Sequence, residues 1–165
     1  MRVILFCLLI TGCAPLFTLD KPKENPSEDI ISTAEQFTGL SEKHHRRQLT
    51  ETLGVDPVRT EWCAAFVNAV LDMNDIQGSG TVSDNPLLAR SFLKWGHPVN
   101  VAQSGDILVF PRGSQSWQGH VGIHASTVYI DGKKWYWVLG GNQSNSVSFK
   151  LYPASYALSI RRPIL

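Results

Sequence analysis

Cysteine is scarce in this sequence of 165 residues, and neither sign of charge predominates. Three Cys are too few for a framework of disulfides. Fifteen Lys and Arg stand against fourteen Asp and Glu without a basic block, so the chain lacks the electrostatic footprint of a nucleic-acid-binding protein. A hydrophobic content of 43%, with five Trp, four Tyr and seven Phe, is enough for a packed core and excludes a wholly disordered chain.

Long hydrophobic runs are also missing. The run from Val3 to Ile10 is too short to span a bilayer, which takes about 20 apolar residues. It follows Arg2 and precedes small residues, a layout that predicts a signal peptide over residues 1–12. The segment ITGC (10–13) resembles the lipobox of bacterial lipoproteins, which implies cleavage before Cys13 and acylation of that residue. A plain secretory signal with an incidental Cys13 is the alternative.

The next segment, residues 14–29, contains three Pro and several charges and is typical of a tether. We therefore divide the chain into a signal peptide (1–12), a lipidated Cys with its tether (13–29) and one domain (30–165). The expected location is outside the cytoplasm, on a bacterial membrane through the lipid on Cys13 and facing the periplasm. Cys63 would then be the one unmodified thiol in an oxidising compartment, which calls for a specific explanation.

Helical spacing gives way to strand alternation near the middle of the domain. Apolar residues at helical intervals predict helices over 30–38, 41–53, from Thr60 to about Met73, and from about Asn85 to Trp95. Short alternating segments predict strands at 106–110, 120–125, 135–139, 147–151 and 158–162, separated by turns such as Asp-Gly. Helices followed by strands predict an α+β fold with an antiparallel sheet.

Cys63 falls at the start of the third predicted helix. With Thr60 as N-cap, Cys63 lies in the first turn, where free N–H groups and the helix dipole favour an anion. A thiolate there would have a lowered pKa and act as a nucleophile. The alternative is a Cys packed as a small hydrophobic residue.

His120 begins a predicted strand and is flanked by Gly, which leaves room for a partner and suits a general base for a thiolate. His124 shares its face but lies about 13 Å further along the strand, so the two cannot reach one thiol or one metal ion, and we expect no metal site. Asn142, just after the 135–139 strand, is the candidate for orienting the imidazole through its amide oxygen. A simple hairpin turn at Gly140–Asn142 is the alternative.

Four motifs occur in order: WCAAFV (62–67), SGDILVF (104–110), GHVG (119–122) and LGGNQ (139–143). Together they resemble the CHAP and NlpC-type cysteine peptidases, and most of all a small CHAP-like subgroup. The likeness covers residues 30–165. It implies a papain-like fold with N-terminal helices packed on a small antiparallel sheet, no cofactor, and Cys63, His120 and Asn142 as nucleophile, base and third member. Two departures are Gly140, where many members have Glu, and Trp62, where many have Gln.

The resemblance implies that the protein cuts a peptide or amide bond in the stem peptides of peptidoglycan. Two Trp are the candidates for lining a substrate groove: Trp62, directly before Cys63, and Trp117, in the loop just before His120. Which bond is cut stays open. A non-catalytic lipoprotein that grips peptidoglycan in the same cleft, and an acyl transferase on the same scaffold, are the two alternatives.

Overall fold

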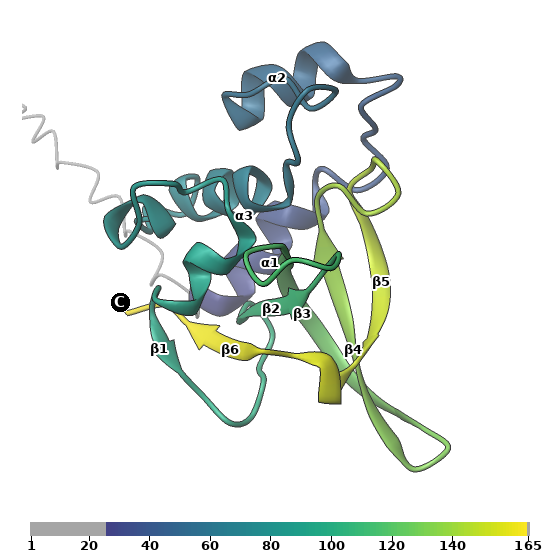
Figure 1. Ribbon diagram of the computed structural model, residues 1–165. Helices are drawn as coiled ribbons and strands as arrows, with labels where there is room; N and C mark the ends of the chain where they lie inside the picture. The colour runs from purple at the N-terminus through teal and green to yellow at the C-terminus, as the bar shows by residue number, and fades with distance from the viewer. Residues whose placement is uncertain (1–25, 165) are drawn as a thin grey trace, which may run out of the picture.

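The computed structural model describes residues 26–164, so the expected signal peptide, Cys13 and nearly all of the tether lie outside the described residues. Three α-helices come first: α1 (Pro26–Glu35), α2 (Arg46–Leu53) and α3 (Cys63–Asp72). An antiparallel sheet of six strands follows (Figure 1). The expected order of helices and then an antiparallel sheet is confirmed. Within residues 26–164, no helix has the length and hydropathy of a membrane span.

The sheet has the strand order β1-β6-β2-β3-β4-β5. Strands β3 and β4 continue past their neighbours as a hairpin, which extends away from the helices in Figure 1. The hairpin closes at Asp131 and Gly132, whose φ values of 50° and 73° fit the tight turn expected from Asp-Gly. The six strands are β1 (His97–Pro98), β2 (Ile107–Pro111), β3 (Gly119–Ile130), β4 (Lys133–Gly140), β5 (Ser148–Pro153) and β6 (Ser159–Arg162).

Some predicted elements have different bounds or types. The segment 85–95 is not an α-helix but contains the 3-10 helix η2 (Ala89–Leu93). Pro86 disfavours helical backbone before it, and Leu88 is extended, so few residues remain before Gly96 turns left-handed at φ 57°. Strand β3 runs on to Ile130, five residues beyond the predicted end, with an irregularity in its pairing between His124 and Ser126.

The main core lies between the helices and one face of the sheet. Its fully buried side chains come from α1, α3 and the inward positions of the strands, and include Ile30, Phe66, Val67, Ile107, Val109, Val121, Ile123 and Leu139. A smaller cluster covers the other face and contains Leu108, Phe110, Tyr136, Val138 and Ile160. Strand alternation therefore places Val121 against the helices and the preceding residue, His120, toward the second cluster.

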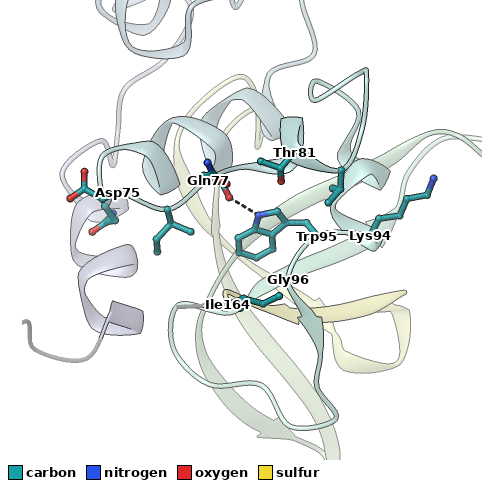
Figure 2. Close-up of a pocket in the computed structure, with 10 residues that line it drawn as sticks. Asp75, Gln77, Thr81, Lys94, Trp95, Gly96 and Ile164 are labelled. Carbon is teal, nitrogen blue, oxygen red and sulfur yellow. Dashed lines mark hydrogen bonds between the residues drawn. The ribbon is translucent and has the colours of Figure 1, made fainter.

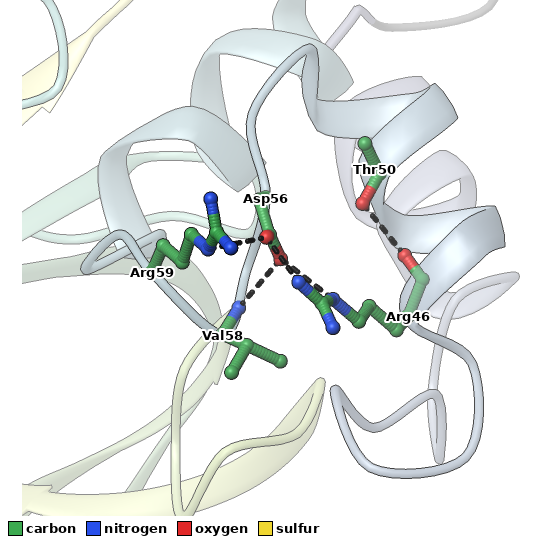
Figure 3. A network of polar contacts seen from close by, with 5 residues as sticks. All are labelled: Arg46, Thr50, Asp56, Val58 and Arg59. Carbon is green, nitrogen blue, oxygen red and sulfur yellow. Dashed lines mark hydrogen bonds and ion pairs between the residues drawn. The ribbon is translucent and has the colours of Figure 1, made fainter.

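Two ionic contacts fix loops to these layers. The carboxylate of Asp106 is completely buried and accepts two hydrogen bonds of 2.8 Å from Arg162, which joins the start of β2 to the end of β6. Asp56, in the loop after α2, accepts from Arg46 in the first turn of α2 and lies 3.6 Å from Arg59 (Figure 3). The second network holds the loop that leads into α3 and so helps to set where that helix begins.

Candidate active site

Cys63 is the first residue of α3, so its expected place in the first turn is confirmed, although the N-cap is Trp62 and not Thr60. The backbone N–H groups of Ala64 and Val121 lie at the sulfur and favour its anion. Burial acts more strongly, because the side chain is only 3% exposed, and it raises the pKa of the Cys63 thiol. The expectation of a lowered thiol pKa is therefore wrong for the resting protein: the helix begins against the core and not in water.

His120 is buried at the start of β3. Its ring stacks on Tyr152, with 5.6 Å between ring centroids, and its Nε2 lies 3.2 Å from Oε1 of Gln143. The other nitrogen, Nδ1, is buried and has no hydrogen-bond partner among the described residues. Burial, together with the positive charges of Arg112 and Lys150, lowers the pKa of His120 to about 4, so the imidazole is neutral near pH 7.

Gln143 determines which nitrogen of His120 carries the proton. Its Nε2 donates to the backbone carbonyls of Val138 and Ser148, which identifies the other amide atom as the oxygen. That oxygen accepts from the Tyr152 hydroxyl at 2.9 Å. Since an amide oxygen cannot donate, it must also accept from His120 Nε2–H. The neutral ring is thus held in the Nε2–H tautomer, and Nδ1 keeps a lone pair that can take a proton.

Asn142 does not hold the imidazole, and this corrects the assignment made from the sequence. Its Nδ2 donates instead to Oε2 of Glu61 at 2.7 Å. Its backbone is left-handed, with φ 56°, so the chain turns at Asn142 and the following residue, Gln143, reaches the ring. The sequence signal for this was the turn-forming Asn after two Gly, because a left-handed residue there changes the direction of the chain and brings the next side chain to the ring.

Gly140 leaves the space that Gln143 and the imidazole fill. A Cβ added at Gly140 would lie 3.2 Å from the side-chain amide carbon of Gln143 and 3.3 Å from Nε2 of His120. Both separations are tighter than ordinary van der Waals contact. The Gly that departs from the pattern of the resembled family is therefore the residue that allows the close approach of the amide to the ring.

Of the two candidate groove residues, Trp62 and Trp117, one is buried in the core and the other lines a groove. Trp62 is completely buried, donates from Nε1 to Glu42 at 3.1 Å and packs against Gly141, so it belongs to the core and its assignment to a groove is wrong. Trp117 is 58% exposed. It lies in a groove of about 340 Å³ whose lining includes Cys63, Glu61, Leu88, Arg112 and Gln118.

A second hollow of about 170 Å³ lies on the His120 side. Arg112 lines both the hollow and the groove, so the two adjoin at this side chain, and we call them together the cleft. The Arg112 guanidinium lies 3.5 Å from the carboxylate of Glu61, which also accepts from Asn142. These contacts join residues that line the hollow, Asn142 and Arg112, to Glu61, which lines the groove with Cys63.

A larger groove of about 540 Å³ lies elsewhere, between the loop after α3 and the C-terminal end of the described chain (Figure 2). Trp95 forms part of its wall, and the indole Nε1 donates to the backbone carbonyl of Gln77 at 2.8 Å. Its lining contains no Cys and no His, so it offers neither a nucleophile nor a base of the kind found in the smaller cleft.

Comparison with known proteins adds no assignment: no family model, curated protein or solved structure matches this chain. Three segments contribute to the candidate site: Cys63 comes from α3, His120 from β3 and Gln143 from the loop between β4 and β5. Gln143 contacts the His120 ring, and the N–H of Val121, the residue after His120, lies at the Cys63 sulfur. In the part of the chain that the structure describes, no three His, Cys, Asp or Glu side chains gather as a metal site requires. The candidate site therefore offers a protonated thiol and a neutral imidazole, which belongs to the residue just before the Val121 N–H that lies at the sulfur.

Burial of His120 predicts a loss of stability in acid. The unfolded chain takes up a proton at this His near pH 6.5, and the folded protein only near pH 4. Between these values the unfolded state holds more protons, so the free energy of unfolding decreases as the pH falls. At pH 4.5 we expect His120 to contribute a loss of roughly 2 to 3 kcal/mol relative to pH 7.5.

Urea unfolding of the native chain and of His120→Gln at both pH values measures this contribution. The pKa of His124 is also lowered by burial and adds a loss of the same sign, which the variant retains. The variant should therefore lose less stability in acid than the native chain, while His97→Gln, on an exposed edge strand, should behave like the native chain. An equal loss in native chain and His120→Gln would show that His120 takes up its proton at the same pH in both states.

Proposed function

We propose that this protein hydrolyses a peptide or amide bond in peptidoglycan stem peptides, with Cys63 as the nucleophile and His120 as the base of a papain-like site. The observation that carries the proposal is the arrangement around His120. Gln143 keeps the proton on Nε2 and leaves the buried Nδ1 unpaired, which is the state that a base needs before it accepts a proton. A module that only binds peptides needs neither a thiol nor a fixed tautomer.

The reaction starts from a neutral thiol and a neutral imidazole. As the substrate carbonyl approaches, Nδ1 of His120 takes the proton of Cys63 and the sulfur bonds to the carbonyl carbon. The N–H groups at the start of α3 and the charge of Arg112 offset the negative charge that develops. His120 then gives its proton to the leaving amine as the C–N bond breaks. Water then attacks the acyl carbon while the same nitrogen takes one of its protons. The C–S bond breaks to release a carboxylic acid, and the imidazolium returns the proton to the sulfur, which restores the thiol.

The cleft and the N-terminal segment support the choice of substrate. Trp117 and Leu88 offer apolar surface beside Cys63, and Arg112 offers a cation, which together suit a peptide that carries charge. The lipobox-like ITGC (10–13) supports an exported protein held at a membrane through Cys13, within reach of the wall. Peptidoglycan and the membrane are the proposed partners.

Purified sacculi incubated with the protein in H₂¹⁸O test the proposal. Hydrolysis releases fragments with a new amine and one ¹⁸O in the new carboxylate, which mass spectrometry identifies together with the bond. Acyl transfer gives a new amide without ¹⁸O, and a binding protein gives no fragments above those of the heat-denatured sample. Either of the last two results would reject hydrolysis.

A further inference from the structure

The hollow beside His120 is positively charged. Arg112 and Lys150 supply two cations, and the residues that line the hollow include no Asp or Glu. Arg112 is partly neutralised by the exposed Glu61, 3.5 Å away. Lys150 has no carboxylate within ion-pair distance among the described residues. The hollow therefore has the charge of an anion site.

Lys150 is held close to the base. It lies on the same face of β5 as Tyr152, and its ammonium is 5.7 Å from the centroid of the Tyr152 ring. That ring stacks in turn on His120. The charges of Lys150 and Arg112 both lower the pKa of His120, so their field reaches the imidazole.

This field opposes the proposed reaction as long as the hollow is empty. His120 must become an imidazolium when it takes the thiol proton, and two nearby cations make that state less stable. An anion between Lys150 and Arg112 would cancel their effect and make His120 a stronger base. Binding of a negatively charged group would then help the chemistry as well as the affinity.

The proposed role of His120 indicates which part of the substrate lies in this hollow. His120 protonates the leaving amine, so the residue that leaves lies on the His120 side of the cleft. The acyl part remains on Cys63 beside Trp117. A volume of about 170 Å³ suits one short residue.

We propose that the hollow of Arg112, Lys150 and Tyr152 binds a carboxylate carried by the residue whose amine leaves. The inference rests on the proposed hydrolysis and narrows its substrates to amides whose leaving amine bears an acidic group. That group is either the C-terminal carboxylate of the peptide or a side-chain carboxylate of the leaving residue. Both present the same anion to Lys150 and Arg112.

Three peptides of otherwise equal sequence distinguish these sources: one with a free C-terminal carboxylate, one with a C-terminal carboxamide, and one with the carboxamide and an acidic side chain on the leaving residue. Calorimetry with the full-length Cys63→Ala protein measures binding without turnover. We expect one or both acidic peptides to bind roughly tenfold more tightly than the neutral one, as charge-assisted hydrogen bonds allow. The acidic peptide that shows the preference identifies the source.

In the same background, Lys150→Met should reduce the preference to about twofold or less, and Lys150→Arg should keep most of it. Lys134→Met, an exposed Lys on β4, is the matched control and should keep all of it. Equal binding of the three peptides, no binding of any of them, or a preference that survives Lys150→Met would each overturn the inference.

Turnover by the native chain separates the two proposals. Cleavage of all three peptides with equal efficiency would support hydrolysis and overturn the carboxylate site. A preference that depends on Lys150, without cleavage of any peptide, would support the carboxylate site and overturn its hydrolytic role.

Discussion

Replacement of Cys63 by Ala is expected to abolish the release of fragments from sacculi, with a fall in rate of roughly 10⁴-fold or more. No other side chain in the groove beside Trp117 can form an acyl intermediate under the same conditions, because Glu61, Leu88 and Arg112 offer no comparable nucleophile. Chromatography of the released fragments measures the rate. Circular dichroism checks that the fold persists, since the change removes a single buried sulfur.

Two further variants control for the position of the change. Cys63→Ser keeps the shape of the side chain but replaces the thiol by a hydroxyl, which this neutral base cannot readily deprotonate, so its activity should also be lost. Met73→Ala, at the exposed far end of α3, should keep the native rate. A Cys63→Ala protein that digests sacculi at the native rate would remove the thiol from the chemistry.

The second large effect is expected at Gln143. In Gln143→Leu the side chain keeps nearly its volume but can no longer accept the proton of His120 Nε2, so the tautomer is no longer fixed. We expect kcat to fall by roughly 10² to 10⁴, with a smaller change in KM, because Gln143 lines the hollow but supplies neither of the two cations proposed to bind the substrate. Steady-state kinetics on a peptide identified from the sacculus digest measures both constants.

Two comparisons distinguish this positioning role from a structural one. Gln143→Glu places a negative charge beside the ring and stabilises the imidazolium. The pKa of His120 should therefore rise, and the acid limb of the pH–rate profile should move to higher pH. Asn142→Gly suits the left-handed backbone at φ 56° and removes only the side chain, so its loss should be much smaller than that of Gln143→Leu. An equal or larger loss at Asn142 would restore Asn142 as the third member.

The sequence predicted most elements because their signals are local. The apolar alternation of β2, the Gly-flanked start of β3 and the helical spacing after Cys63 each follow from neighbouring residues. The segment 85–95 was misjudged because a helix-like apolar pattern there competes with Pro86 and Gly96, and the backbone preferences of these two residues prevail. The length of β3 depends on its pairing with β4, which a single strand does not encode.

Within the site, the place of a residue in its helix or strand was easier to predict than the burial of its side chain. Cys63 and His120 lie where the motifs indicate, but the pKa of the thiol depends on how deeply α3 begins in the core, which is a tertiary property. Trp62 was misassigned for the same reason, because its exposure depends on Gly141 and Glu42 from distant segments. Gln143 was missed because one left-handed residue redirects the chain.

The Cys63 thiol is protonated in the resting protein and only 3% exposed, so it should also be oxidised slowly. Peroxide attacks the thiolate, and conversion to sulfenic acid needs access to the sulfur, so both properties slow the damage. In the proposed mechanism the sulfur of Cys63 becomes reactive only when a peptide is bound and His120 takes the thiol proton. A buried, uncharged thiol of this kind therefore resists oxidation without a disulfide partner.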